Sequence, residues 1–255
     1  MAQERINALA ILNLLAEASG LDGLPLAADG PTIPVGSITE RAATAESCGP
    51  LGLPALLAGE VPWLLHRLGP PRAEPRPRLI LPGSFRPLHA GHLRMAELAE
   101  QLVGLPCLFE LSLFHPAKPP LDYLSVADRA ARFAGVDGWL LLTDAPTYLD
   151  KARLFPGATF VVGHDTAVRI VEPRWYGGTA ARDAMLDELE ALDTRFLVFG
   201  RVDATGRFRD LDAETFDEPR VARFVARTSR VVAESEFRSD LSSTLLRTQS
   251  PEELP

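Results

Sequence analysis

The sequence is poor in cysteine and lysine and has no long apolar run, and these shortages exclude several classes of protein. Its two cysteines, Cys48 and Cys107, provide neither a disulfide framework nor a cysteine-based metal site. No run of about 18 apolar residues is present, so we expect no membrane span. The 34 acidic residues outnumber the 26 basic ones, and the net charge of -8 argues against a long nucleic acid as partner. We therefore expect a cytoplasmic protein. Its acidic net charge is still compatible with a local pocket that binds an anion.

Residues 1–78 differ in pattern from the rest of the chain. Apolar residues at helical spacing predict a helix over residues 4–19 and a second helix over residues 54–68. Four prolines then predict an extended linker over residues 69–78. The chain is therefore expected to have an N-terminal appendage, a main domain and a short tail, over residues 1–78, 79–248 and 249–255.

From residue 79 onward, short apolar runs alternate with stretches of amphipathic helical pattern. Strands are predicted over residues 79–81, 107–114, 139–142, 159–162 and 196–199, and helices over residues 93–103, 126–133 and 181–192. A parallel sheet requires this alternation, because each crossover between parallel neighbours needs a helix-length return. We predict an α/β fold, a doubly wound parallel sheet with helices on both faces.

The turn after the first predicted strand carries two histidines, His89 and His92, at the start of a helix. Residues three apart on a helix project toward the same side. Between them, Gly91 lacks the side chain that would keep a phosphate away from the backbone. The amides and dipole of the helix N-terminus favour an anion, and two imidazoles can donate hydrogen bonds to a phosphate during displacement. The turn is therefore predicted to bind a phosphate.

A second candidate phosphate site lies near the end of the sequence. Ser242, Ser243 and Thr244 are strong N-cap residues, whose hydroxyl groups and following amides can hold β- and γ-phosphates. Arg247 follows one turn later and can neutralise a leaving pyrophosphate.

These two segments resemble the HxGH nucleotidyltransferase superfamily, the adenylyl- and cytidylyltransferases. The family motif G-[ST]-F-D-P-x-H-x-G-H is matched over residues 83–92, except that Arg86 replaces the aspartate, and I-S-S-T-x-x-R is matched over residues 241–247. The resemblance implies a Rossmann-like fold. It also implies that the nucleotide is bound by Gly83, Ser84 and Phe85, together with Gly91 and the 242–244 hydroxyls.

The segments between the two motifs make the chain similar to nicotinamide-mononucleotide adenylyltransferases. These segments span residues 109–121, 145–157 and 161–166, although His115 and Ala117 replace the asparagine and aspartate of the nearest relatives. The resemblance implies that ATP, arriving with Mg²⁺, gives its adenylyl group to nicotinamide or nicotinate mononucleotide in NAD biosynthesis. It further implies that pyrophosphate is released and that the catalytic residues are His89, His92, Lys118 and Arg247.

Other candidate residues follow predicted strands. Gly163, Asp165 and Thr166 end one strand, where a short polar pair can bind a ribose or simply cap the next helix. Arg201 follows another strand, where its side chain can lie at the edge of a site for a phosphate or an adenine ring. The aromatic pair Trp175 and Tyr176 can stack on a pyridine ring of the acceptor or pack in the core. Lys151 and Arg153 are expected to be surface charges, and no metal-ligand set is predicted.

Two alternatives to the adenylyltransferase function remain open at this stage. A homo-oligomer is compatible with the sequence as well. The first is a CTP-dependent cytidylyltransferase acting on a phosphorylated alcohol, although its usual Arg-Thr-x-Gly is replaced by other residues at 237–240. The second is a nucleotide-binding protein without turnover, in which residues 1–78 serve as an interaction module. The departures at Arg86, His115 and Ala117 keep this second alternative open.

Overall fold

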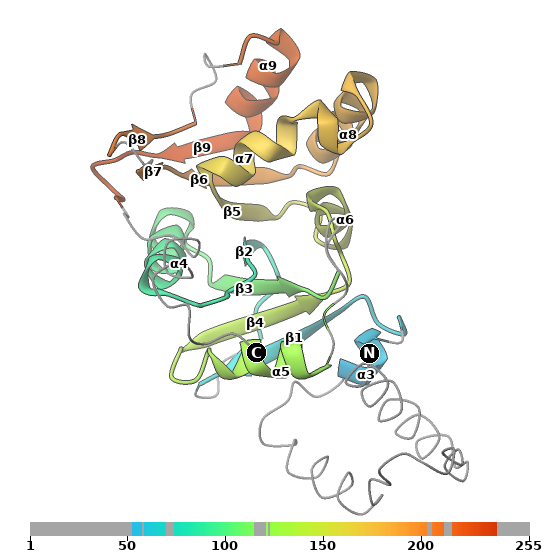
Figure 1. Ribbon diagram of the computed structural model, residues 1–255, viewed down its shortest axis with the longest axis vertical. Coiled ribbons are helices and arrows are strands. Elements are labelled where there is room, and N and C mark those ends of the chain that lie inside the picture. The colour runs from blue at the N-terminus through green and yellow to red at the C-terminus, as the bar shows by residue number, and fades with distance from the viewer. Residues whose placement is uncertain are drawn as a thin grey trace, which may run out of the picture. The chain divides into compact units, whose positions relative to one another are not determined.

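The computed structural model describes residues 53–57, 59–69, 74–114, 121, 123–202, 206–211 and 216–238. A seven-stranded sheet runs through this part of the chain, with strand order β1-β4-β3-β2-β5-β6-β9 (Figure 1). Its strands are β1 (Trp63–Leu68), β2 (Leu79–Pro82), β3 (Cys107–Ser112), β4 (Gly138–Thr143), β5 (Thr159–Gly163), β6 (Arg195–Phe199) and β9 (Ser229–Val232). A small antiparallel hairpin, β7 (Arg201–Val202) and β8 (Phe208–Arg209), stands apart from this sheet.

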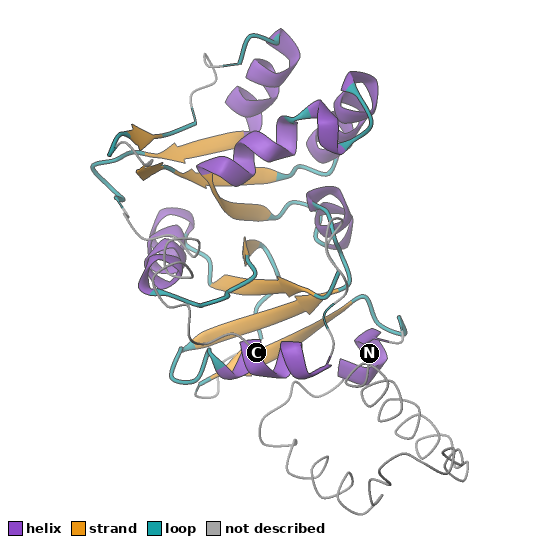
Figure 2. Ribbon diagram, viewed as in Figure 1, coloured by secondary structure: helices purple, strands orange, loops and turns teal. Residues whose placement is uncertain are grey.

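Helices connect the strands, as the alternating pattern predicted (Figure 2). They are α3 (Leu53–Leu57), α4 (Ala90–Val103), α5 (Tyr123–Ala131), α6 (Tyr148–Leu154), α7 (His164–Val171), the 3-10 turn η1 (Pro173–Trp175), α8 (Thr179–Ala191) and α9 (Pro219–Thr228). Six strands of the sheet run parallel to one another, and β1 is antiparallel to its neighbour β4. The predicted doubly wound α/β fold is therefore confirmed.

Alternate residues along each strand enter two different apolar cores. In β2, Leu79 and Leu81 join the core beneath α4 and α5, whereas Ile80 joins the core beneath α6, α7, α8 and α9. Successive side chains of a strand point to opposite faces, so a strand that is apolar throughout must be covered twice. The helices therefore lie on both faces of the sheet.

The prediction of a helix over residues 54–68 is wrong in its second half. Helix α3 ends at Leu57, and β1 follows as an edge strand of the main sheet. Within β1, Leu64 packs in one core and Leu65 in the other, which is the period of a strand. A short apolar run fits both periods, and the pairing with β4 decides between them.

Most predicted elements are confirmed with ends displaced by one to three residues, as at α4, which begins at Ala90. Helices α6, α7 and α9 and strand β9 were not predicted, because each is short or interrupted by charged residues. The predicted helix over residues 4–19 and the tail lie outside the described residues. Among the helices of the described ranges, none has the length and hydropathy that a membrane span needs.

Candidate active site

The chain order of the sheet reverses between β2 and β5, which are parallel neighbours at its centre. From β2 the chain continues to β3 on one side, and from β5 it continues to β6 on the other. Open α/β sheets bind ligands beyond the carboxyl ends of the strands at such a switch point. The register that pairs Leu79 with Thr159 brings Gly83 and Gly163 to the same level, at the start of the two loops that flank the switch point.

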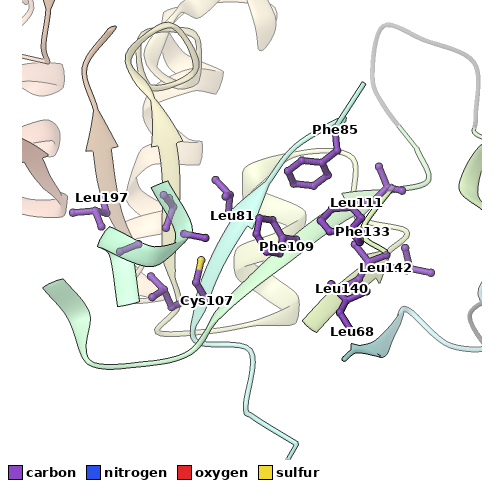
Figure 3. Packing of buried hydrophobic residues seen from close by; sticks show 14 of the residues in the cluster. Leu68, Leu81, Phe85, Cys107, Phe109, Leu111, Phe133, Leu140, Leu142 and Leu197 are labelled. Carbon is purple, nitrogen blue, oxygen red and sulfur yellow. The ribbon is translucent and has the colours of Figure 1, made fainter. Parts of the chain in front are cut away.

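The loop after β2 is built on a buried phenylalanine. Phe85 is 1% exposed, and its ring makes edge contacts with Phe109 and Phe133, at centroid distances of 5.7 and 5.2 Å (Figure 3). It makes a further edge contact with His92, at a centroid distance of 5.2 Å. A side chain on Gly83 would come within 2.7 Å of this ring, so Gly83 is needed for the ring to fold back onto the loop. Phe85 was predicted to bind the nucleotide, which stays a prediction, and its buried ring packs beneath His92.

The two predicted catalytic histidines lie against each other at the N-terminus of α4. Their rings stack with centroids 3.8 Å apart and planes inclined by 26°. The backbone N–H of His89 donates to Nδ1 of His92 over 3.3 Å. Because Nδ1 of His92 is an acceptor, the hydrogen of the neutral ring is on Nε2, and that atom is the donor available to a ligand.

Both imidazoles are neutral at physiological pH. Burial, reinforced by the neighbouring His89, lowers the pKa of His92 from 6.5 to about 4. Burial also lowers the pKa of His89. The pair therefore offers neutral N–H donors at a helix terminus whose dipole favours an anion.

Two further residues of the first motif have different surroundings. The side chain of Ser84 is exposed, and its carbonyl accepts a hydrogen bond of 3.2 Å from Arg129 on α5. Gly91 is buried in the first turn of α4, so its backbone lies inside the helix packing rather than at an open surface. Of the residues predicted here, Ser84, His89 and His92 are thus the ones with side chains available for a ligand.

The loop after β5 is only the turn at Gly163, where β5 passes directly into α7, and it is more open. Apart from the two neighbours of Gly163 in the chain, no described residue comes within 4 Å of the position that a side chain on Gly163 would occupy. Asp165, in the first turn of α7, forms an ion pair with Arg201 at the start of β7, and His164 Nδ1 lies 3.3 Å from its other carboxylate oxygen. The fold therefore brings together two residues that sequence analysis predicted separately. Thr166 lies half-buried beside them in the same turn.

The aromatic pair predicted to bind the acceptor lies at the other end of α7. Eight residues of helix separate it from Gly163, which is about 12 Å of helix. Trp175 is 53% exposed, and its Nε1 donates to Glu172 over 2.9 Å. Tyr176 packs in the apolar core and donates its hydroxyl hydrogen to the Ile170 carbonyl over 2.9 Å. Neither side chain joins the two loops, and core packing explains Tyr176.

Five of the predicted residues lie outside the part of the chain that the structure describes, namely Lys118, Ser242, Ser243, Thr244 and Arg247. Within the described ranges, no three side chains of histidine, cysteine, aspartate or glutamate gather as a metal site.

The expectation that Lys151 is a surface charge is wrong. Lys151 is 4% exposed, and its Nζ donates to Glu110 over 2.8 Å and to the Ala145 carbonyl over 2.6 Å. Sequence analysis missed this group, although Lys151 is one of only two lysines in an arginine-rich chain. Arg153 is exposed and pairs with Glu188, as a surface charge would.

Comparison with known families agrees with the fold. The model of the family described as cytidylyltransferase-like matches residues 80–249, a range that includes the two histidines and the 241–247 segment. A search of curated proteins returned no match. The family match covers more than half of the chain and supports nucleotidyltransferase activity in general. The chain therefore belongs to the cytidylyltransferase-like family, within the nucleotidyltransferase superfamily.

Proposed function

We propose that this protein transfers the adenylyl group of ATP to nicotinamide mononucleotide or nicotinate mononucleotide and releases pyrophosphate, as a step of NAD biosynthesis. The observation that carries the transfer chemistry is the stacked pair of neutral histidines at the N-terminus of α4. The pyridine mononucleotide and the choice of ATP rest on the similarity of the segments between the two motifs.

In the proposed reaction, an oxygen of the acceptor phosphate attacks the α-phosphorus of ATP. A bond forms between that oxygen and the α-phosphorus, and the bond from the α-phosphorus to the β-phosphate oxygen breaks. The attacking oxygen is already anionic, so no side chain has to remove a proton. Positioning and charge stabilisation are then the main tasks of the protein.

The histidines stabilise the charge that develops on the transferring phosphoryl group. His92 donates from Nε2, since its Nδ1 is held by the His89 amide. Neutral donors fixed in a partly buried site need no reorganisation when the charge develops. The helix terminus beneath them favours the same negative charge.

The loop after β5 is proposed to receive the nucleoside. The empty space beside Gly163 allows a ligand to approach the backbone closely. Asp165 can accept from a ribose hydroxyl once Arg201 turns away, and Arg201 is then available to a phosphate. Lys118, Ser242, Ser243, Thr244 and Arg247 are proposed to hold the triphosphate, with Mg²⁺ entering as part of the ATP complex.

The test is pyrophosphate release from the purified full-length protein with Mg²⁺. ATP and CTP are each combined with nicotinamide mononucleotide, nicotinate mononucleotide and a set of phosphorylated alcohols. Release with ATP and one pyridine mononucleotide supports the proposal and identifies the acceptor. Release only with CTP and a phosphorylated alcohol would replace it by a cytidylyltransferase, and nucleotide binding without any release would replace it by a binding protein.

A further inference from the structure

The described part of the chain contains a buried ion pair, Glu110 with Lys151, to which the transfer chemistry assigns no task. Glu110 is 1% exposed and Lys151 is 4% exposed. Thr143, at the end of β4, donates to the same Glu110 oxygen over 2.6 Å. The charges are therefore surrounded by partners that come from three elements, β3, β4 and α6.

Glu110 also holds the loop that carries the histidines. Its main-chain carbonyl accepts the N–H of Gly83 over 2.9 Å. Gly83 begins the loop in which Phe85 supports His92. A displacement of Glu110 in β3 would therefore move the first residue of that loop.

The same network holds a second segment at its base. Leu113 donates its N–H to the Thr143 carbonyl over 2.9 Å, and Leu121 donates to the Leu113 carbonyl over 2.8 Å. The Ala145 carbonyl, which accepts from Lys151, also accepts from Ser112 over 2.8 Å. Leu113 and Leu121 are thus joined to each other next to the ion pair, and in the sequence they flank the stretch that contains Lys118.

Helix α6 is oriented so that Lys151 reaches the network. Thr147 caps the helix by accepting from the Asp150 amide over 3.1 Å, and Asp150 accepts in return from the Thr147 amide over 3.2 Å. This reciprocal cap fixes the first turn, from which the Lys151 side chain extends to Glu110.

A buried ion pair of this kind contributes little net stability to a protein. Moving two charges out of water costs about as much as their attraction returns, and apolar residues of similar volume often stabilise a core as well or better. The pair does impose geometry, because each charge must keep all of its partners to avoid being buried alone. Its geometry here connects the two segments described above.

We propose that Glu110 and Lys151 are positioning residues, which set the spacing between the histidine-bearing loop at Gly83 and the base of the 113–121 segment. The catalytic consequence rests on the proposed nucleotidyl transfer: the pair keeps the loop that carries the α-phosphate donors in place relative to Leu113 and Leu121.

The test compares a neutral pair with a matched control. Glu110→Gln with Lys151→Met removes both charges together, so no unpaired charge is left in the core. Lys151→Met alone buries the carboxylate unpaired and is the variant at risk of not folding. The control is Arg182→Met, which removes another buried cation, bonded to Val171, Asp183 and Glu218 and not to either segment.

Two measurements test whether Glu110 and Lys151 act as positioning residues. Well below each melting temperature, the neutral pair is expected to lower kcat by about 10–100-fold, as a misplacement near 1 Å does, while Arg182→Met keeps the wild-type kcat. Hydrogen exchange of the full chain without ligand is expected to accelerate at the amides of Gly83 and Leu113 in the neutral pair but not in the control. Unchanged exchange at both amides, or a kcat that falls equally in the control, would overturn the proposal.

The exchange measurement also separates this proposal from the proposed function. If the wild-type protein releases no pyrophosphate with any substrate pair, the proposed function fails. Faster exchange at both amides would even then support the positioning of the two segments, and unchanged exchange would overturn it.

Discussion

The two loops at the switch point begin with glycine and meet opposite requirements. Gly83 is confined, because a side chain there would strike the Phe85 ring at 2.7 Å. Apart from the two neighbours of Gly163 in the chain, no described residue comes within 4 Å of a side chain placed there. The first loop is fixed by the core of the protein, and the second is open among the described residues. Gly83 therefore serves the fold, whereas under the proposed function Gly163 leaves space for the nucleoside.

The polar groups of the first loop are held in place, whereas those of the second loop are exposed. His89 and His92 are stacked and held by a backbone hydrogen bond, so their donors are already in place. Among the described residues, the Asp165 carboxylate pairs with Arg201 and lies beside His164, and the side chains of Asp165 and Arg201 are 47% and 42% exposed. A rigid loop suits charge stabilisation in a transition state, whereas an exposed ion pair can exchange its partner for a substrate.

Removal of His92 is the change expected to have the largest effect. His92→Ala deletes one preorganised donor, which usually lowers kcat by about 10²–10³-fold. Pyrophosphate release is the measurement, and circular dichroism checks the fold. His66→Ala is the control, since His66 is another partly buried histidine but lies on β1. A folded His92→Ala protein with the kcat of the wild type would contradict the role of the rigid loop.

The rigid loop also predicts a dependence of stability on pH. The pKa of His92 is lowered from 6.5 to about 4, so the unfolded chain binds a proton in this interval while the folded chain does not. The free energy of unfolding should be highest above pH 6.5 and fall by up to about 3 kcal/mol as the pH drops toward 4.

Urea unfolding across this interval tests the prediction against His92→Gln. Carboxylates titrate near its lower end in both proteins, so the difference between the two slopes isolates the histidine. Parallel curves for the wild type and His92→Gln would show that His92 does not enter the fold as a buried neutral group.

The loop over residues 83–92 was largely predictable from sequence, whereas the buried contacts that hold it were not. Its functional atoms come from ten consecutive residues, so a local motif describes them, from Gly83 to His92. The burial of Lys151 depends on Glu110, which is 41 residues away, and no local pattern contains that pairing. The pairing of β1 with β4 is equally remote, which is why its apolar run was mistaken for part of a helix.

Alanine in place of each glycine should affect the confined loop and the open loop differently. Gly83→Ala forces the Phe85 ring to move and should cost about 1–3 kcal/mol of unfolding free energy, as overpacking of a core does. Gly163→Ala should change stability by less than about 0.5 kcal/mol but raise the KM for ATP about tenfold, since one methyl group fills the ligand's space. Thermal unfolding and ATP titration distinguish the two. Equal losses of stability would contradict the distinction drawn between the loops.

The exposed ion pair gives the smallest expected change in stability and the clearest measure of how loosely the second loop is held. Asp165→Asn and Arg201→Gln should each lower the unfolding free energy by less than about 1 kcal/mol, because solvent screens a pair of this exposure. If ATP replaces Arg201 as the partner of Asp165, Asp165→Asn weakens ATP binding by more than it weakens the fold. A double-mutant cycle measures the coupling of the two residues without ATP and with saturating ATP. Coupling that disappears with ATP supports an exchange of partners, whereas coupling that persists unchanged would make the pair a structural part of the loop, held as firmly as the two histidines of the other loop.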